Sequence, residues 1–146
     1  MDKMTNTDLF QILGLDHVVL RVMDLERAKH FYCDVLGCTV DRFREDLGLL
    51  QLRAGRSLID LVDVNGTLGV RGGTAPQINA PNMDHFCLRI EPFEEASIRD
   101  HLKAHDIEIG ESGMRYGADG NGPSLYIKDP DGNAVELKGP PEDAAA

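Results

Sequence analysis

The chain contains an internal repeat, and this repeat restricts the possible folds more than any other feature. Residues 16–22 read DHVVLRV, and residues 84–90 read DHFCLRI. Both copies place a histidine at the second position of an alternating run that is typical of a strand. A helical stretch and further strands follow each copy, so a unit of similar size occurs twice. The sequence therefore predicts two equivalent modules, each presenting one imidazole.

Each module is predicted to follow the order βαβββ. Asp24 is a good N-cap for a helix that runs to about Leu36 and is closed by Gly37. In the second module, Pro92 is expected near the first turn of the helix, and Asp129-Pro130-Asp131-Gly132 predicts a tight turn before the last strand. The expected strands are 13–22, 39–43, 49–53, 58–64, 83–90, a short one near 108–109, 125–128 and 134–137.

These elements predict an α+β fold with one domain at residues 1–138. Its modules are expected at about 13–64 and 83–138, joined by a linker at 65–82 that is rich in Gly, Pro and Asn. Residues 139–146 are expected to form a disordered tail. Residues 114–123 are also glycine-rich, and they predict either a mobile lid over a substrate or a long hairpin connection.

Each module also carries one carboxylate inside an apolar, strand-like run. These are Asp60 in residues 57–62 and Glu136 in residues 133–138. Because successive strand residues alternate between faces, His17 and His85 are predicted to point away from the helices, as are the two acids. A curled sheet would bring His17, Asp60, His85 and Glu136 into one cavity. Two imidazoles and two carboxylates are a typical ligand set for a divalent metal.

Composition excludes several classes of function. The net charge is −10, which disfavours binding to nucleic acid or to an anionic membrane. The three cysteines have no zinc-site spacing, the N-terminus does not resemble a signal peptide, and no apolar run is long enough to span a bilayer. We therefore expect a cytoplasmic protein that acts on a small molecule.

Several motifs closely resemble the vicinal oxygen chelate superfamily, and its glyoxalase I branch in particular. They are HVVLRV at 17–22, Asp24-Leu25, Phe31-Tyr32, VLG at 35–37, DPDGN at 129–133 and Val135-Glu136-Leu137. The resemblance covers about residues 13–138. It implies a curled mixed sheet around a metal cavity, with His17, Asp60, His85 and Glu136 as ligands of one divalent ion. Nickel, zinc, cobalt, manganese or iron(II) would serve, without an organic cofactor.

The resemblance further implies a glyoxalase-like lyase or isomerase. Its substrate would carry vicinal oxygens and react through an enediolate-type intermediate, with Glu136 and Asp60 as the catalytic carboxylates. Arg21 follows His17 by four residues, like the glyoxalase arginine that grips a glutathione carboxylate; an internal ion pair is the alternative. The residues expected to bind substrate are Arg21, Arg89, Arg115 and Tyr116.

Two departures from the glyoxalase pattern keep other functions open. Asp60 stands where glyoxalases usually have Glu, and Val64 stands where an asparagine usually helps to bind glutathione. The alternatives are an extradiol iron(II) dioxygenase that uses His17, His85 and Glu136, a fosfomycin-resistance-like transferase, and a metal-free binding module. We expect a homodimer, with the site formed either within one chain or between two.

Overall fold

The computed structural model describes residues 9–77, 79–81 and 83–142, and it contains the βαβββ order twice. The first module consists of β1 (His17–Val22), α1 (Leu25–Lys29) continued by a π-helical turn η1 (His30–Val35), β2 (Thr39–Arg44), η2 (Glu45–Leu47), β3 (Leu49–Ala54) and β4 (Ser57–Asp63). A short helix η3 (Gly69–Gly72) lies in the linker. The second module consists of β5 (Phe86–Arg89), α2 (Glu95–Ala104), β6 (Ser112–Gly117), β7 (Gly120–Lys128) and β8 (Ala134–Lys138).

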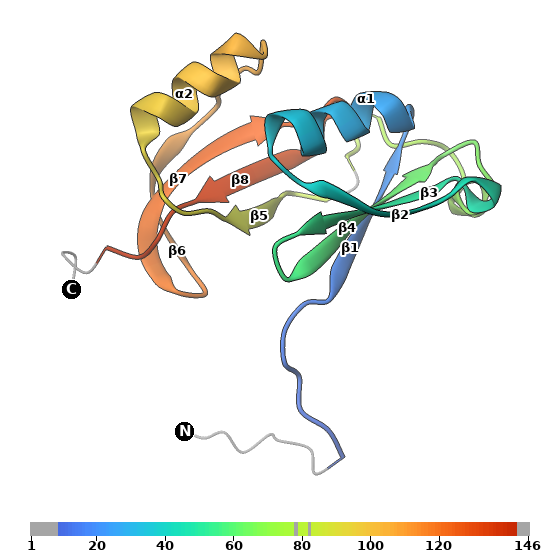
Figure 1. Cartoon of the computed structure of the whole chain (residues 1–146), viewed down its shortest axis with the longest axis horizontal. Coiled ribbons are helices and arrows are strands. Elements are labelled where there is room, and N and C mark those ends of the chain that lie inside the picture. The colour runs from blue at the N-terminus through green and yellow to red at the C-terminus, as the bar shows by residue number, and fades with distance from the viewer. Residues whose placement is uncertain (1–8, 78, 82, 143–146) are drawn as a thin grey trace.

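Each module forms its own four-stranded mixed sheet. The strand orders are β1-β4-β3-β2 and β5-β8-β7-β6, so the same topology occurs twice. The first and last strands of each module are parallel, and the other pairs are antiparallel. Figure 1 shows the two sheets side by side, with α1 and α2 above them. The α+β fold class is confirmed, and the two sheets do not close into a barrel.

Strand alternation buries one face of each sheet beneath the helices. In β1, Leu20 and Val22 are fully buried, whereas the intervening positions are more exposed. One apolar cluster joins both modules, because Phe31 and Tyr32 of η1 belong to the same core as Leu125 of β7. The modules therefore share a single hydrophobic core, as expected for a chain of this length.

The first helix begins and ends where the sequence predicts. The Asp24 side chain accepts a hydrogen bond from the backbone amide of Arg27 and so caps the N-terminus. Gly37 follows the helix with φ +89°, a left-handed conformation that glycine adopts without strain. The helix packs an apolar stripe against the sheet, made of Ala28, Phe31, Tyr32 and Val35, which are all buried.

The DPDGN turn links the two modules. The buried Asp129 carboxylate accepts from the Tyr32 hydroxyl at 2.6 Å, from the backbone amides of Asp131 and Asn133, and from the Asn133 side chain. The Asp131 carboxylate accepts from the backbone amide of Met23. Burial, followed by the Asp129 charge, raises the pKa of Tyr32 well above its usual value. The turn is thus a polar junction inside the core as well as a chain reversal.

The strands β1 and β5 begin later than predicted, because each begins only where its neighbouring strand begins. The first strand was expected from residue 13, but β1 begins at His17, which pairs with Leu58 near the start of β4. Among the described residues upstream of His17, the carbonyls of Leu15 and Asp16 contact β4, where they accept hydrogen bonds from Ser57 and Leu58, and Leu13 is 94% exposed. The strand predicted at 83–90 likewise begins only at Phe86, which pairs with Val135 of β8.

The second module requires a further correction. Pro92 lies just before α2 and so near its first turn, as expected, whereas residues 108–109 form no strand. The glycine-rich segment 114–123 belongs mostly to the antiparallel β6–β7 hairpin, which agrees with the hairpin alternative. Gly120, with φ +115°, permits the chain reversal.

The predicted tail begins with ordered contacts. The amides of Gly139 and Glu142 donate to the carbonyls of Pro123 and Asn121, respectively. Residues 143–146 lie outside the described residues. Among the residues that are described, no helix is both long and apolar enough to cross a membrane.

Candidate metal and substrate site

Asp60 and Glu136 occupy equivalent places on the sheet faces that point away from the helices. Asp60 of β4 pairs with Val19 of the neighbouring strand β1, and Glu136 of β8 pairs with Cys87 of the neighbouring strand β5. Both side chains are nevertheless well buried, with relative exposures of 5% and 6%. A carboxylate buried to this degree is costly unless hydrogen bonds or a cation compensate for its lost hydration.

In the second module, Glu136 is surrounded by polar side chains. His85 Nε2 lies 3.2 Å from Glu136 Oε1, and the Ser124 hydroxyl donates to Oε2 at 2.6 Å. The other imidazole nitrogen, Nδ1, lies 2.6 Å from an Asp84 carboxylate oxygen. Such an outer carboxylate orients an imidazole and raises its basicity as a ligand. His85 and Glu136 are therefore brought together as predicted.

Tyr126 and Cys87 complete the wall around Glu136. The Tyr126 ring meets the His85 ring edge-on, with the ring centroids 5.5 Å apart. Burial, followed by the nearby Glu136 carboxylate, raises the pKa of the Cys87 thiol to about 11. Cys87 is therefore a neutral thiol near pH 7, which disfavours a nucleophilic role. Burial and Glu136 also raise the pKa of Tyr126, which keeps its phenol available as a proton donor.

In the first module, Asp60 is only partly satisfied. The Gln51 amide donates to Asp60 Oδ2 at 3.1 Å, whereas the buried Oδ1 has no hydrogen-bond partner among the described residues. His17 is half-exposed, and its Nδ1 lies 3.8 Å from Asp16. It belongs to the same sheet face as Val19, the residue level with Asp60. The unsatisfied oxygen leaves a position that a cation or a hydrogen-bond donor would fill.

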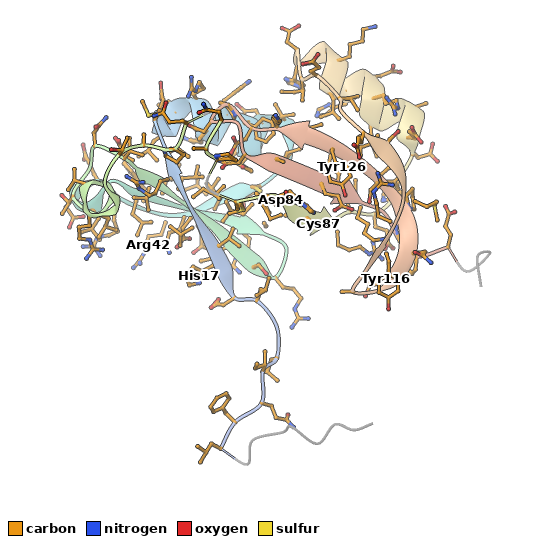
Figure 2. The ribbon with its side chains drawn as sticks, turned by 180° about the vertical axis from the view of Figure 1, so that it is seen from behind. His17, Arg42, Asp84, Cys87, Tyr116 and Tyr126 are labelled. Atoms are coloured by element: carbon orange, nitrogen blue, oxygen red, sulfur yellow. The ribbon has the colours of Figure 1, made fainter. Side chains whose placement is uncertain are left out.

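The two histidine–carboxylate pairs do not meet within one chain. Within residues 9–77, 79–81 and 83–142, no three or more His, Cys, Asp or Glu side chains are grouped so that they could hold a metal ion. Figure 2 shows His17 on the first sheet, apart from Cys87 and Tyr126 on the second. A single chain thus contains two half-sets of the predicted ligands.

Arg21 contacts backbone carbonyls and forms no ion pair with an acid among the described residues. Its guanidinium donates to the backbone carbonyls of Gly69, Gly73 and Thr74 in the linker. Gly72 lies against it so closely that a Cβ added there would come within 2.5 Å of Arg21 Nε. Arg21 therefore holds the linker against β1.

The other three residues expected to bind substrate lie around the second module. Arg89 forms ion pairs with Asp119 at 2.9 Å and Glu91 at 3.1 Å. The Arg115 guanidinium lies 5.6 Å from the centroid of the Tyr126 ring, so it is close to the side chains that surround Glu136. Tyr116, near the tip of the β6–β7 hairpin, is 82% exposed.

A cavity of about 600 Å³ lies over the first sheet. This volume suits a small organic ligand. Its walls come from β1, β3, β4 and the linker, and it is lined by Val19, Arg21, Leu49, Asp60, Val62, Leu68, Arg71 and Gly72. Most of the wall is apolar, and the polar groups are one carboxylate and two arginines.

Sequence reasoning missed Ser124, Tyr126, Lys138 and Arg71. Strand parity could have found the first three, because β7 places Tyr126 level with Glu136 and Ser124 level with Lys138. Lys138 is 5% exposed, and its Nζ has no hydrogen-bond partner in the described part of the chain. Arg71 gave no such signal, because its position depends on how the linker folds back over the sheet.

The other three histidines gather where the helices of the two modules meet. The His101 and His105 rings are 4.8 Å apart, and the His30 and His105 rings are 6.1 Å apart, measured between centroids. His101 Nε2 donates to the carbonyl of Val35 at 2.7 Å. This group, the helix histidine cluster, lies on the helix side of the sheets and is separate from Glu136.

Comparison with known proteins agrees with this architecture. A family model described as Glyoxalase/Bleomycin resistance protein/Dioxygenase superfamily matches residues 14–137. Catechol-2,3-dioxygenase of Bacillus subtilis is 26% identical over 132 residues, covering 90% of this chain and 43% of that protein. Mitochondrial methylmalonyl-CoA epimerase of Mus musculus is 29% identical over 139 residues, covering 91% and 76%. An integron cassette protein from the V. cholerae mobile metagenome, VCH_CASS1, has a TM-score of 0.71 and 28% identity, covering 90% of this chain and 98% of its own.

Proposed function

Because the chain belongs to the glyoxalase/bleomycin resistance protein/dioxygenase superfamily, we propose that it is a divalent-metal-dependent lyase or isomerase. Its substrate is a small molecule with two neighbouring oxygens, on which the enzyme moves a proton. The observation that carries the proposal is the buried Asp60 carboxylate, whose Oδ1 has no partner within the described residues. A divalent cation would compensate for its burial directly. The His85–Glu136 pair offers the same kinds of ligand on the other sheet.

We propose that the complete site forms between two chains. One chain would supply His17 and Asp60, and its partner would supply His85 and Glu136. The separation of the two half-sets within one chain supports this arrangement. A two-fold dimer would then contain two equivalent sites, because each chain contributes both halves once.

The side chains around Glu136 suit proton transfer. A bound divalent ion would stabilise negative charge that develops on the two substrate oxygens. Glu136 would accept the substrate proton, while Ser124 holds one of its oxygens and His85 contacts the other. Tyr126 stands beside the same carboxylate as a neutral phenol that can donate a hydrogen bond to the substrate.

The dioxygenase alternative fits these residues less well. Extradiol enzymes of the superfamily use a further histidine near the iron, whereas the other three histidines here form the helix histidine cluster. The similarity to the Bacillus subtilis catechol dioxygenase spans less than half of that protein. The similarity to an epimerase spans most of its length and favours isomerase chemistry.

Mixing two inactive variants would test the shared site. His17→Ala and His85→Ala homodimers should each take up little metal in equilibrium dialysis followed by elemental analysis. Refolding them together should restore one complete site in each mixed dimer, with half the metal content of a wild-type dimer. Proton exchange on a 2-oxoaldehyde hemithioacetal should return in parallel. A wild-type protein that takes up no metal would overturn the proposed function, and mixed dimers without metal would overturn the shared site.

Adventitious metal binding needs its own control, because the helix histidine cluster contains three imidazoles. His105→Ala removes one imidazole from that cluster and leaves both half-sets intact. This variant should therefore bind as much metal as the wild type. If it loses metal while His85→Ala retains it, the assignment of the ligands is wrong.

A further inference from the structure

We propose that Arg71 recognises a negatively charged group at the far end of the substrate. The substrate class would then be an organic anion whose charge is separated from its paired oxygens by an apolar segment. The placement of the paired oxygens at Asp60 rests on the proposed function. The recognition of the anion by Arg71 is independent of the proposed function, and it can be tested in the absence of metal.

The cavity over the first sheet provides three kinds of contact. Asp60 contributes a buried acceptor, Oδ1, that has no partner in the described part of the chain. Val19, Leu49, Val62 and Leu68 provide apolar walls, and Arg71 lies among the lining residues. A ligand that matches these contacts has a polar group for Asp60, an apolar body and an anion for the guanidinium.

The two arginines of this cavity have different roles. Arg21 Nη1 and Nη2 donate to three linker carbonyls and so hold the turn that contains η3, whereas the buried Nε has no hydrogen-bond partner among the described residues. Arg71 belongs to that same turn, and within the described residues its side chain forms no hydrogen bond or ion pair. Most other arginines on the surface are paired with acids, as Arg44 is with Asp46 and Arg53 is with Asp41.

An unpaired guanidinium is notable here because the chain carries a net charge of −10. Organic anions are repelled by the molecule as a whole, so binding one requires a local cation. Arg71 is an exposed residue of the cavity wall, so an incoming anion can reach it, and the apolar residues beside it can cover the apolar segment of the ligand. Arg71 is held in position by a turn that Arg21 fixes, which reduces the ordering cost of binding.

The test uses metal-free protein and a series of ω-hydroxycarboxylates: 4-hydroxybutanoate, 6-hydroxyhexanoate and 8-hydroxyoctanoate. The hydroxyl can donate to Asp60 while the carboxylate meets Arg71, and the series finds the chain length that spans the cavity. Dissociation constants come from ligand-observed NMR titration. We expect at least one member to bind, and Arg71→Gln to weaken its binding by about tenfold or more. Arg71→Lys should retain part of the affinity, because it keeps the charge.

Arg56→Gln is the matched control. Arg56 is an exposed arginine in the β3–β4 turn, outside the cavity lining, so its removal changes the net charge equally. Its effect on affinity should stay within about twofold, and the neutral 1,6-hexanediol should bind Arg71→Gln and wild type alike. The proposal fails if no ω-hydroxycarboxylate binds, if both glutamine variants weaken binding equally, or if the diol binds as well as the acid. Arg71→Gln should keep wild-type metal uptake, so failure here is distinguishable from failure of the proposed metal site.

Discussion

Replacing Tyr32 with Phe should destabilise the junction between the modules by a predictable amount. The change removes one hydroxyl and preserves the ring, so apolar packing in the core is nearly unchanged. Both partners of the lost hydrogen bond are buried, with Tyr32 at 0% and Asp129 at 4% exposure, and they lie 2.6 Å apart. A hydrogen bond to a charged group contributes about 1.5–3 kcal/mol to stability. Asp129 keeps three other donors, which favours the lower half of that range, about 2 kcal/mol.

Urea unfolding and thermal melting would measure this loss. For a chain of this size, about 2 kcal/mol corresponds to a fall in Tm of about 4–8 °C. Tyr116→Phe is the matched control, because Tyr116 is 82% exposed and should change stability by less than about 0.5 kcal/mol. If Tyr32→Phe also stays within about 0.5 kcal/mol of the wild type, Asp129 is not the polar junction described above.

The same pair predicts a loss of stability at alkaline pH. Burial and Asp129 raise the pKa of Tyr32 in the folded protein, so the neutral phenol is favoured there. Its stabilising contribution is complete below the unfolded pKa of about 10, and it is lost as pH rises through the folded value. The wild type should therefore lose stability above about pH 10 more steeply than Tyr32→Phe does. Urea midpoints between pH 8 and 11 would show parallel curves if Tyr32 ionised equally in both states.

Three further substitutions test individual contacts by urea unfolding. Gly72→Ala should destabilise the protein by about 1–3 kcal/mol and increase proteolysis in the linker, because the added Cβ would meet Arg21; unchanged proteolysis would contradict that contact. Lys138→Met should stabilise it by about 1–3 kcal/mol, because Nζ is buried without a partner among the described residues; a loss of stability would show that the ammonium group is satisfied. Arg27→Ala should change stability by less than about 0.5 kcal/mol, because its ion pair with Asp131 is long, at 3.5 Å, and half-exposed on the Arg27 side; a larger loss would give Arg27 a place in the module junction.

The sequence predicts what depends on local pattern and on the repeat. Strand parity correctly places Leu20 and Val22 in the core, and it places His17 on the opposite face. The helix from Asp24 to Gly37 follows from its cap and its glycine. Strand ends depend instead on the neighbouring strand, which explains why β1 begins only where β4 begins. Local propensity contains no information about that partner.

Arg21 shows a second limit of sequence reasoning. Arg21 lies on the same face of β1 as His17, yet its partners are backbone carbonyls 48 to 53 residues away. Every residue has a backbone carbonyl, so the sequence does not indicate which carbonyls an arginine contacts. It therefore cannot distinguish an arginine that stabilises a loop from one that binds a substrate. Arg71 is the converse case, since only the folded linker carries it to the cavity wall.

The two half-sets of ligands differ in how well their carboxylates are satisfied, and this difference bears on how two chains would assemble. In the second module the Glu136 oxygens contact His85 and Ser124, whereas in the first module Asp60 keeps a buried oxygen without a partner among the residues described. In one possible two-fold dimer, the first module of each chain faces the second module of its partner. Asp60 of one chain then lies next to His85 and Glu136 of the other chain. Facing two first modules would instead bring two Asp60 carboxylates together and leave both Glu136 clusters without a partner. Either arrangement brings two buried carboxylates together, so each needs a cation to offset their repulsion. The first arrangement adds His85, which Asp84 already orients, to the shared site, and we therefore expect a divalent metal to favour it.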